Sequence, residues 1–226
     1  MKNQVFTLLL AVFVCITVNA QTNTNQVKLQ SIVQTSEINQ FFDGLFDKLG
    51  IKVIDTKENL TLVQEGGKIT VNAGLVDSEV DFILELESRN IDNVERFTSD
   101  GKIDAEEATA IAAVFFTPFT KSTLKNPVLS ANSKRKAAKI DDLTHVKLVN
   151  SKNEVIASHT LVYAAKQWLV FEGLVGNPQR VFTLNADSAM VYQKQVSKAI
   201  KIGSNKGWLT FLKWWKGWRE ENSVKM

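Results

Sequence analysis

The chain is poor in reactive side chains, with one cysteine and two histidines among 226 residues. The cysteine, Cys15, lies in an apolar segment close to the N-terminus, so the rest of the chain has no thiol for disulfides, thiolate metal sites or cysteine nucleophiles. The formal net charge is +3, too small to attract nucleic acid to the chain as a whole. We therefore expect a fold stabilised by an ordinary apolar core, with no cofactor and no nucleic-acid partner.

Motifs that bind phosphate or build a catalytic elbow are also missing. The sequence contains no phosphate-binding glycine loop and no G-x-S-x-G pattern. Residues 98–107 look like the second half of a calcium loop that would end at Glu107, but Arg96 stands where the ion needs a carboxylate. We expect Asp104 and Glu107 to form a helix capping box instead, and we expect no metal site.

Residues 1–20 have the features of a secretory signal peptide. Lys2 precedes an uncharged apolar run from Val5 to Val18, which is shorter than the roughly 20 residues that span a bilayer. Val18 and Ala20 suit the −3 and −1 sites of a signal peptidase, whereas acylation at Cys15 is the less favoured alternative. The protein is therefore expected to be exported to the periplasm or the extracellular space, with peripheral membrane contact as a further expectation.

Composition and periodicity divide the remaining chain into three parts. Residues 21–35 are polar at their start and are expected to form a flexible leader. Residues 36–204 are expected to form an α+β domain, interrupted by a basic excursion near 121–139. Residues 205–226 are expected to form a tryptophan-rich amphipathic terminal helix.

The domain is expected to begin with an aromatic helix. Ser36 is a good N-cap, and Gly50 suits the end of the helix. Between them, apolar residues recur with helical spacing at Ile38, Phe41, Phe42, Leu45 and Leu49. A second helix is expected to start at Asp104 and to end before Pro118, because proline disfavours helical geometry in the residue before it.

Short β-prone runs, several of them separated by turn residues, predict the sheet. They cover 60–64, 69–73, 79–87, 144–149, 155–163, 167–171 and 181–184. A short helix is expected near 91–97, and another is expected to be capped by Asn185 and to run towards Ile200. Strands bracketed by helices without regular alternation predict the α+β class, with an antiparallel sheet covered by amphipathic helices.

The C-terminal segment holds four of the five tryptophans within eleven positions. Tryptophan combines a large apolar ring with one N–H group, so it favours surfaces between water and apolar material. The aromatic residues expected on this helix are Trp208, Phe211, Trp214, Trp215 and Trp218. The segment has three interpretations: a membrane-interface helix, the cover of an apolar cavity, or a terminal helix that simply packs on the sheet.

Nearby cations and the two histidines add candidate polar contacts. Lys213, Lys216 and Arg219 flank the tryptophans and would suit anionic headgroups, and Arg180 after a turn is a further anion candidate. His145 and His159 each lie in a predicted strand, where a polar strand position is the simpler interpretation and a hydrolase site the minor one.

Several features in the first half occur in a familiar order. They are an aromatic helix, a hairpin, an acidic alternating strand, a Gly-Lys turn and an aromatic pair, at Phe41–Phe42, Gly66–Lys68, Asp81–Leu86, Gly101–Ile103 and Phe115–Phe116. Over about residues 41–116 the chain thus resembles the sterol carrier protein 2 (SCP-2) lipid-binding family. The resemblance implies an α+β fold with an apolar tunnel and non-catalytic binding of sterols or acyl chains. Thr117–Phe119 departs from the glycine- and lysine-rich strand that follows in the family.

These observations favour an exported, non-catalytic binding protein for a lipid or another hydrophobic small molecule. The aromatic residues Phe41, Phe42 and Phe115 and the tryptophan helix would contact the ligand, and that helix would cover the cavity or touch a membrane. An alternative is an envelope module that binds a protein partner through the tryptophan face and has no ligand cavity. A continuous apolar cavity would favour the binding protein, and a solid core would favour the alternative.

Overall fold

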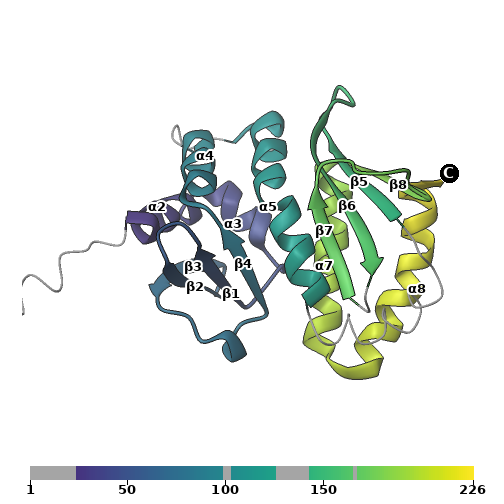
Figure 1. The fold of residues 1–226 in the computed structure, drawn as a ribbon. Coiled ribbons are helices and arrows are strands. Elements are labelled where there is room, and N and C mark those ends of the chain that lie inside the picture. Colours follow the sequence, from purple (N-terminus) through teal and green to yellow (C-terminus); the bar gives the residue numbers. More distant parts are fainter. Residues whose placement is uncertain (1–23, 99–102, 126–142, 165–166) are drawn as a thin grey trace, which may run out of the picture.

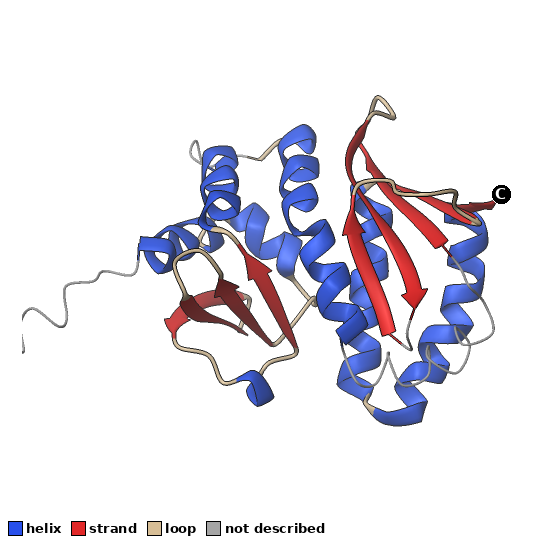
Figure 2. Cartoon of the chain, viewed as in Figure 1, coloured by secondary structure: helices blue, strands red, loops and turns tan. Residues whose placement is uncertain are grey.

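The computed structural model describes residues 24–98, 103–125, 143–164 and 167–226 (Figure 1). The expected signal peptide and residues 126–139 of the expected basic excursion lie outside this part of the chain. Within it, no helix combines the length and the apolar character that a membrane span requires. The α+β class is confirmed, because helices cover two separate sheets (Figure 2).

The first sheet contains four strands in the order β3-β2-β1-β4. Their bounds are β1 (Lys48–Val53), β2 (Glu58–Glu65), β3 (Lys68–Ala73) and β4 (Phe82–Leu86). Neighbouring strands are antiparallel except β1 and β4, which are parallel. A crossover that includes the short helix η1 (Asp77–Glu79) connects β3 to β4.

The second sheet contains five strands in the order β7-β6-β5-β8-β9. Their bounds are β5 (Leu143–Val149), β6 (Val155–Ala164), β7 (Gln167–Glu172), β8 (Arg180–Leu184) and β9 (Ser223–Lys225). Here β5 and β8 form the parallel pair, and the other pairs are antiparallel. The prediction of an antiparallel sheet is therefore mostly right, with one parallel pair in each sheet.

Helix α5 lies between the two sheets (Figure 1). The helices are α2 (Thr24–Val33), α3 (Ser36–Phe42), α4 (Ser88–Thr98), α5 (Ala105–Lys125), α7 (Ala186–Ile202) and α8 (Ser204–Asn222). Helix α5 contacts β4 and α4 on one side and β6, β7 and α7 on the other. We call β1–β4 with α2–α4 the N-terminal half, and β5–β9 with α7 and α8 the C-terminal half.

The two halves repeat one topology. In each, a three-stranded antiparallel meander crosses over to a strand parallel to the first. Two helices follow, α4 and α5 after β4 and α7 and α8 after β8, while α2 and α3 precede the first meander. A side-chain hydrogen bond repeats as well, because the Thr61 hydroxyl donates to the Gly74 carbonyl at 2.7 Å and the Thr160 hydroxyl to the Gly173 carbonyl at 2.8 Å. Both glycines have positive φ, 92° and 76°, which favours glycine where the chain leaves the meander. Corresponding positions of the halves can therefore be compared.

The N-terminal half has a filled core. The strand residues on the helix-covered face of its sheet are at most 5% exposed: Leu49, Ile51, Val53, Leu60, Leu62, Ile69, Val71, Phe82, Leu84 and Leu86. Phe42 and Phe46 of the adjoining chain pack against them, with their ring centroids 5.6 Å apart. This half satisfies the expectation of a solid apolar core.

The first helix is shorter than the sequence predicts. Helix α3 ends at Phe42, and the residues expected to extend it to Leu49 form a turn and then strand β1. Leu45, in the turn, and Leu49, in β1, are both fully buried. Their separation along the chain equals the spacing of one helix face, so the apolar pattern resembled a longer helix. Gly50 is a strand residue rather than a helix stop. A glycine suits this position because a β-carbon there would lie 2.6 Å from the Leu75 side chain on the crossover.

Two further predictions about helix boundaries are wrong. The expected leader, 21–35, is largely helix α2, whose buried Leu29 and Ile32 join the N-terminal core. Helix α5 continues past Pro118 to Lys125, although an internal proline removes a backbone donor. Residues beyond the proline, including Phe119, are buried, and their packing offsets that cost.

Other local predictions are confirmed. Asp104 accepts hydrogen bonds from the Glu106 and Glu107 backbone N–H groups, and the Glu107 carboxylate accepts one from the Asp104 N–H, which completes the capping box. Asn185 caps α7 by accepting from the Ser188 N–H at 2.8 Å. Helix α8 starts at Ser204, one residue before the expected start, and ends at Asn222 before the unexpected strand β9.

Candidate functional site

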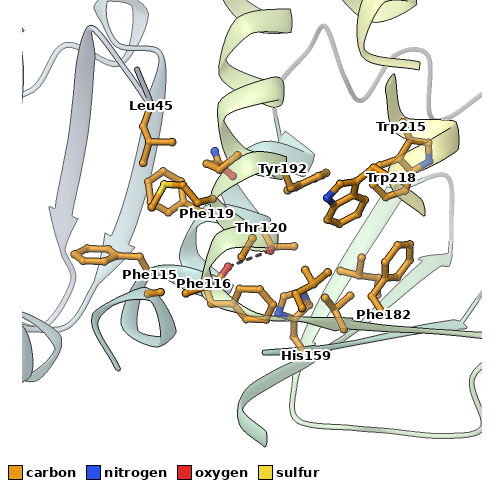
Figure 3. A pocket seen from close by; sticks show the side chains of 18 residues that line it. Leu45, Phe115, Phe116, Phe119, Thr120, His159, Phe182, Tyr192, Trp215 and Trp218 are labelled. Carbon is orange, nitrogen blue, oxygen red and sulfur yellow. Dashed lines mark hydrogen bonds between the residues drawn. The ribbon is translucent and has the colours of Figure 1, made fainter. Parts of the chain in front are cut away.

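An apolar cavity of about 110 Å³ lies in the C-terminal half, between the second sheet and helices α5, α7 and α8. Figure 3 shows its wall, with the Phe115, Phe116 and Phe119 rings on one side and Trp218 on another. Leu45 is the only N-terminal-half residue among the described residues of the wall. The cavity therefore belongs to the second sheet and its helices.

The repeat shows why this half is not filled. Ile51 on β1 pairs with Leu60 on β2, and Val146 on β5 pairs with His159 on β6. His159 therefore occupies the position of Leu60. Both residues are buried, at 1% and 0% exposure, so the imidazole sits where the other half has a core leucine.

Two more positions on this face become polar in the C-terminal half. Thr144 pairs with Arg180 in the register in which Leu49 pairs with Phe82. A polar side chain fills less of an apolar core and requires hydrogen-bond partners. The second sheet is therefore less suited to a solid core than the first.

His159 is the most unusual residue of the cavity. Its Nδ1 lies 3.4 Å from the Thr117 hydroxyl, and its ring centroid lies 4.7 Å from that of Phe116. Its Nε2 is buried and has no hydrogen-bond partner in the described part of the chain. Burial, with a smaller effect of the Lys121 ammonium, lowers the pKa of His159 from 6.5 to about 4. The imidazole is therefore neutral at pH 7.

We expect this histidine to make the folded state less stable as the pH falls. The unfolded chain takes up the proton near pH 6.5 and the folded chain only near pH 4. His159 titration therefore leaves the free energy of unfolding unchanged above pH 6.5, lowers it as the pH falls, and reaches its full effect below about pH 4. The loss across this window is roughly 3 kcal/mol. Urea unfolding of the wild type and of His159→Leu between pH 7.5 and 4 measures it. Equal pH dependence in the two proteins would contradict the lowered pKa.

Helix α7 supplies two further polar groups to the cavity wall. Gln193 is 7% exposed, and its Nε2 has no partner among the described residues. Burial raises the pKa of Tyr192 to about 12, so its phenol stays neutral. The cavity thus has an apolar wall with uncharged polar groups.

The tryptophans of α8 point inward. Trp215 and Trp218 line the cavity, and Trp218 is 8% exposed and stacks on Phe182 with ring centroids 5.8 Å apart. Phe211 is buried, and Trp208 and Trp214 are half-buried against the core beside it. The helix covers the cavity with its aromatic face, so an interpretation in which that face lies in a membrane interface does not match this geometry.

The other aromatic candidates divide between the cavity and the N-terminal core. Phe115 lines the cavity, and its ring lies 5.6 Å from that of Phe42, which packs behind it and is not part of the wall. Phe41 lies in α3, but its side chain is outside the described residues. The structure thus brings Phe115 together with Trp215 and Trp218.

The candidate cations lie on β8 and on α8. Arg180 donates to the Ser223 hydroxyl at 2.8 Å and so ties β8 to β9. Lys213 and Lys216 are exposed, and Arg219 is half-buried near the end of α8. The Ser223 hydroxyl in turn donates to the Arg219 carbonyl at 2.6 Å, so Arg180 lies near the end of α8. An anion site formed by these cations stays a prediction.

The two histidines lie on opposite faces of the sheet, since His145 neighbours Val146, which pairs with His159. His145 Nε2 lies 3.0 Å from the Val175 carbonyl of the crossover. Among the described residues, no ion pair joins either imidazole to a carboxylate, and no three potential metal ligands come together. The histidines therefore do not form a joint site.

Sequence reasoning missed much of the wall. Phe116, Phe119, Phe182, Tyr192 and Gln193 were not among the candidates. Because side chains alternate between the faces of a strand, the expected strand 155–163 already places His159 and Leu161 on one side of the sheet. Which helices cover that side depends on long-range packing.

Comparisons with known proteins give one partial likeness. A scan against protein-family models finds no match, and a search of curated proteins finds none either. Among solved structures, the chain is similar to "Sterol Carrier Protein 2 from Yarrowia Lipolytica (apo form)", with 14% sequence identity and a TM-score of 0.28. The match covers 54% of this chain and 95% of that chain. The similarity to an SCP-2 structure is thus limited to about half of the chain.

Proposed function

We propose that this protein is an exported, non-catalytic binding protein for a lipid or another hydrophobic small molecule, which it holds in the cavity under α8. One observation carries the proposal: of two halves with the same topology, one has a core of strand residues at most 5% exposed, and the other has an aromatic-walled cavity. Ligand pockets are concave, mostly apolar and carry a few polar groups, as this cavity does. The alternative, an envelope module that binds a protein partner through the tryptophan face and has no ligand cavity, is not favoured, because a cavity lies beneath that face.

The size of the cavity defines how the ligand would be accommodated. With α8 in its present position, about 110 Å³ is available, and typical ligand pockets measure roughly 300–1,000 Å³. We propose that α8 moves outward when a lipid binds. It joins α7 at Gly203, whose φ of 66° marks a sharp break between the helices.

Native mass spectrometry of the protein purified gently from membranes tests the proposal. We expect a retained mass that matches a lipid in the wild type. Ala189→Phe would fill the cavity from α7 and should remove that mass, while Lys198→Phe, on the solvent side of the same helix, should keep it. A clean protein mass in the wild type under these conditions would contradict the carrier function.

The solvent faces of α7 and α8 suit an anionic membrane. Five lysines are exposed on them and form no ion pair within the described chain: Lys194, Lys198, Lys206, Lys213 and Lys216. Ile202 and Leu209, near the junction of the helices, are 40% and 57% exposed. We propose that this face, rather than the inward tryptophans, contacts anionic headgroups, since clustered lysines gain about 1 kcal/mol each near such a surface.

Vesicle sedimentation tests the membrane contact. The wild type should bind phosphatidylglycerol vesicles at low salt and lose binding in phosphatidylcholine vesicles or at high salt. Reversing the charge at Lys206 and Lys213 should weaken binding at least tenfold, whereas reversing it at Lys52 in the N-terminal half should not. Binding that is insensitive to salt and to these substitutions would contradict an electrostatic membrane contact.

A further inference from the structure

We infer that His159 forms a polar subsite in the cavity, which holds the uncharged hydroxyl head of an otherwise apolar ligand, with Gln193 as a second donor in the wall. This inference rests on the proposed function and names the class of ligand. It is carried by two polar side chains that are more than nine-tenths buried, line one cavity, and each have an unpartnered nitrogen within the described structure.

An unpartnered buried nitrogen indicates a missing partner. Buried polar groups in folded proteins are almost always hydrogen-bonded, because leaving one unsatisfied is unfavourable. The imidazole of His159 has Thr117 at Nδ1 and, among the residues that the structure describes, no partner at Nε2. The corresponding residue of the N-terminal half is Leu60, so the fold does not require a histidine at this position. The exception is best explained by a partner that enters the cavity.

Charge and hydrogen-bond chemistry select the head group. Burial keeps the His159 imidazole neutral, so it has one donor and one acceptor nitrogen. The Thr117 hydroxyl can serve Nδ1 in either role, and Nε2 then takes the opposite one. A hydroxyl matches Nε2 in both cases, and its oxygen is also an acceptor of the kind that the Gln193 amide N–H requires. A carboxylate would bring an unpaired charge into an apolar wall, which is far less favourable.

The geometry places this head group inside the protein rather than at its surface. Phe116 lies against the His159 ring, and Phe182 and Trp218 stand nearby on the sheet and on α8 (Figure 3). The apolar part of the ligand would therefore lie along the aromatic wall beneath α8. Lys121 acts on the imidazole through its charge, but its ammonium lies 3.9 Å from Glu172, which offsets an attraction for anions.

Binding of three probes of equal chain length, 1-hexanol, hexane and hexanoate, tests the inference. The readout is intrinsic tryptophan fluorescence, to which Trp215 and Trp218 in the cavity wall contribute, with Kd determined at pH 7.5 for the wild type and His159→Leu. We expect His159→Leu to weaken 1-hexanol binding about tenfold or more and to leave hexane binding unchanged or tighter. His145→Gln is the matched control, because that histidine lies on the opposite face, and it should bind all probes as the wild type does.

The outcomes separate the two proposals. If wild type and His159→Leu bind 1-hexanol equally well, the subsite is wrong and the binding function stands. If hexanoate binds the wild type more tightly than 1-hexanol, the head group is an anion and the inference is overturned. If the wild type binds neither 1-hexanol nor hexane, the proposed function fails as well. Should His159→Leu lower the Tm, Gln193→Met replaces it, with the same selective loss of 1-hexanol affinity expected.

Discussion

Replacing Trp218 by alanine is expected to lower the free energy of unfolding by about 3–5 kcal/mol, the range for truncating a buried aromatic residue. Its ring centroid lies 5.2 Å from that of Trp215, 5.3 Å from Tyr192 and 5.8 Å from Phe182. These contacts join α8 to α7 and to the second sheet. The substitution therefore removes the central contact of the cavity cover as well as its own buried surface.

Urea unfolding followed by circular dichroism measures this effect. Lys216→Ala is the matched control, since that residue precedes Trp218 by two positions on the same helix and is exposed. We expect it to change the free energy of unfolding by less than about 0.5 kcal/mol. A Trp218→Ala protein as stable as this control would mean that α8 does not cover the cavity in solution.

Two glycines of α8 are expected to respond to alanine in opposite directions. Gly207 is buried where α8 crosses α7, and a β-carbon there would overlap the Ala199 carbonyl oxygen and lie 3.1 Å from its carbon. Gly207→Ala should therefore destabilise the protein by about 3 kcal/mol, because the helices must move apart. Nothing lies within 4 Å of such a carbon at Gly217, so Gly217→Ala should stabilise the helix by about 0.5–1 kcal/mol.

Thermal unfolding of the two variants beside the wild type tests the helix crossing. The expected result is a lower Tm for Gly207→Ala and a slightly higher Tm for Gly217→Ala. Both substitutions add one methyl group to the same helix, so intrinsic helix propensity favours both equally. A gain in Tm for both would show that α7 and α8 do not approach as closely as described.

Apart from β1 and β9, the strands were the most predictable part of the fold. The runs around 144–149 and 155–163 are rich in β-branched and other β-prone residues and are separated by the turn residues Asn150–Asn153, and strands β5 and β6 follow them closely. The hairpin at Gly66 and Gly67 was predictable because glycine is favoured in tight hairpin turns. In the structure both residues adopt the positive φ that such a turn requires, 58° and 75°. Local chemistry determines these elements, and the sequence displays it.

Features that depend on distant contacts were not predictable. The parallel pairing of β1 with β4 depends on the crossover, in which Leu75 packs over Gly50. Helix α5 passes Pro118 because Phe119 and its neighbours are buried against β4 and the cavity. Neither contact leaves a local pattern, and the division into two sheets is equally hidden.

The candidate site was predictable only in its aromatic part. The inward placement of Trp215 and Trp218 follows one of the interpretations given for the terminal helix, that of a cavity cover. The importance of His159 emerges only from its equivalence to Leu60 and from its unpartnered nitrogen. The equivalence depends on the repeat, which the two halves share too little sequence pattern to reveal. The unpartnered nitrogen depends on the packing around the imidazole.

Helix α5 belongs to both halves, and this has a consequence for cooperativity. Its Phe115 and Phe119 rings contact Phe42 and Phe82 in the N-terminal core and also form part of the cavity wall. A ligand that binds there stabilises the helix, and by mass action the stabilisation extends to every segment that must open together with α5. Amide hydrogen exchange in β4 should therefore slow when a ligand fills the cavity, although no residue of β4 belongs to the described cavity wall.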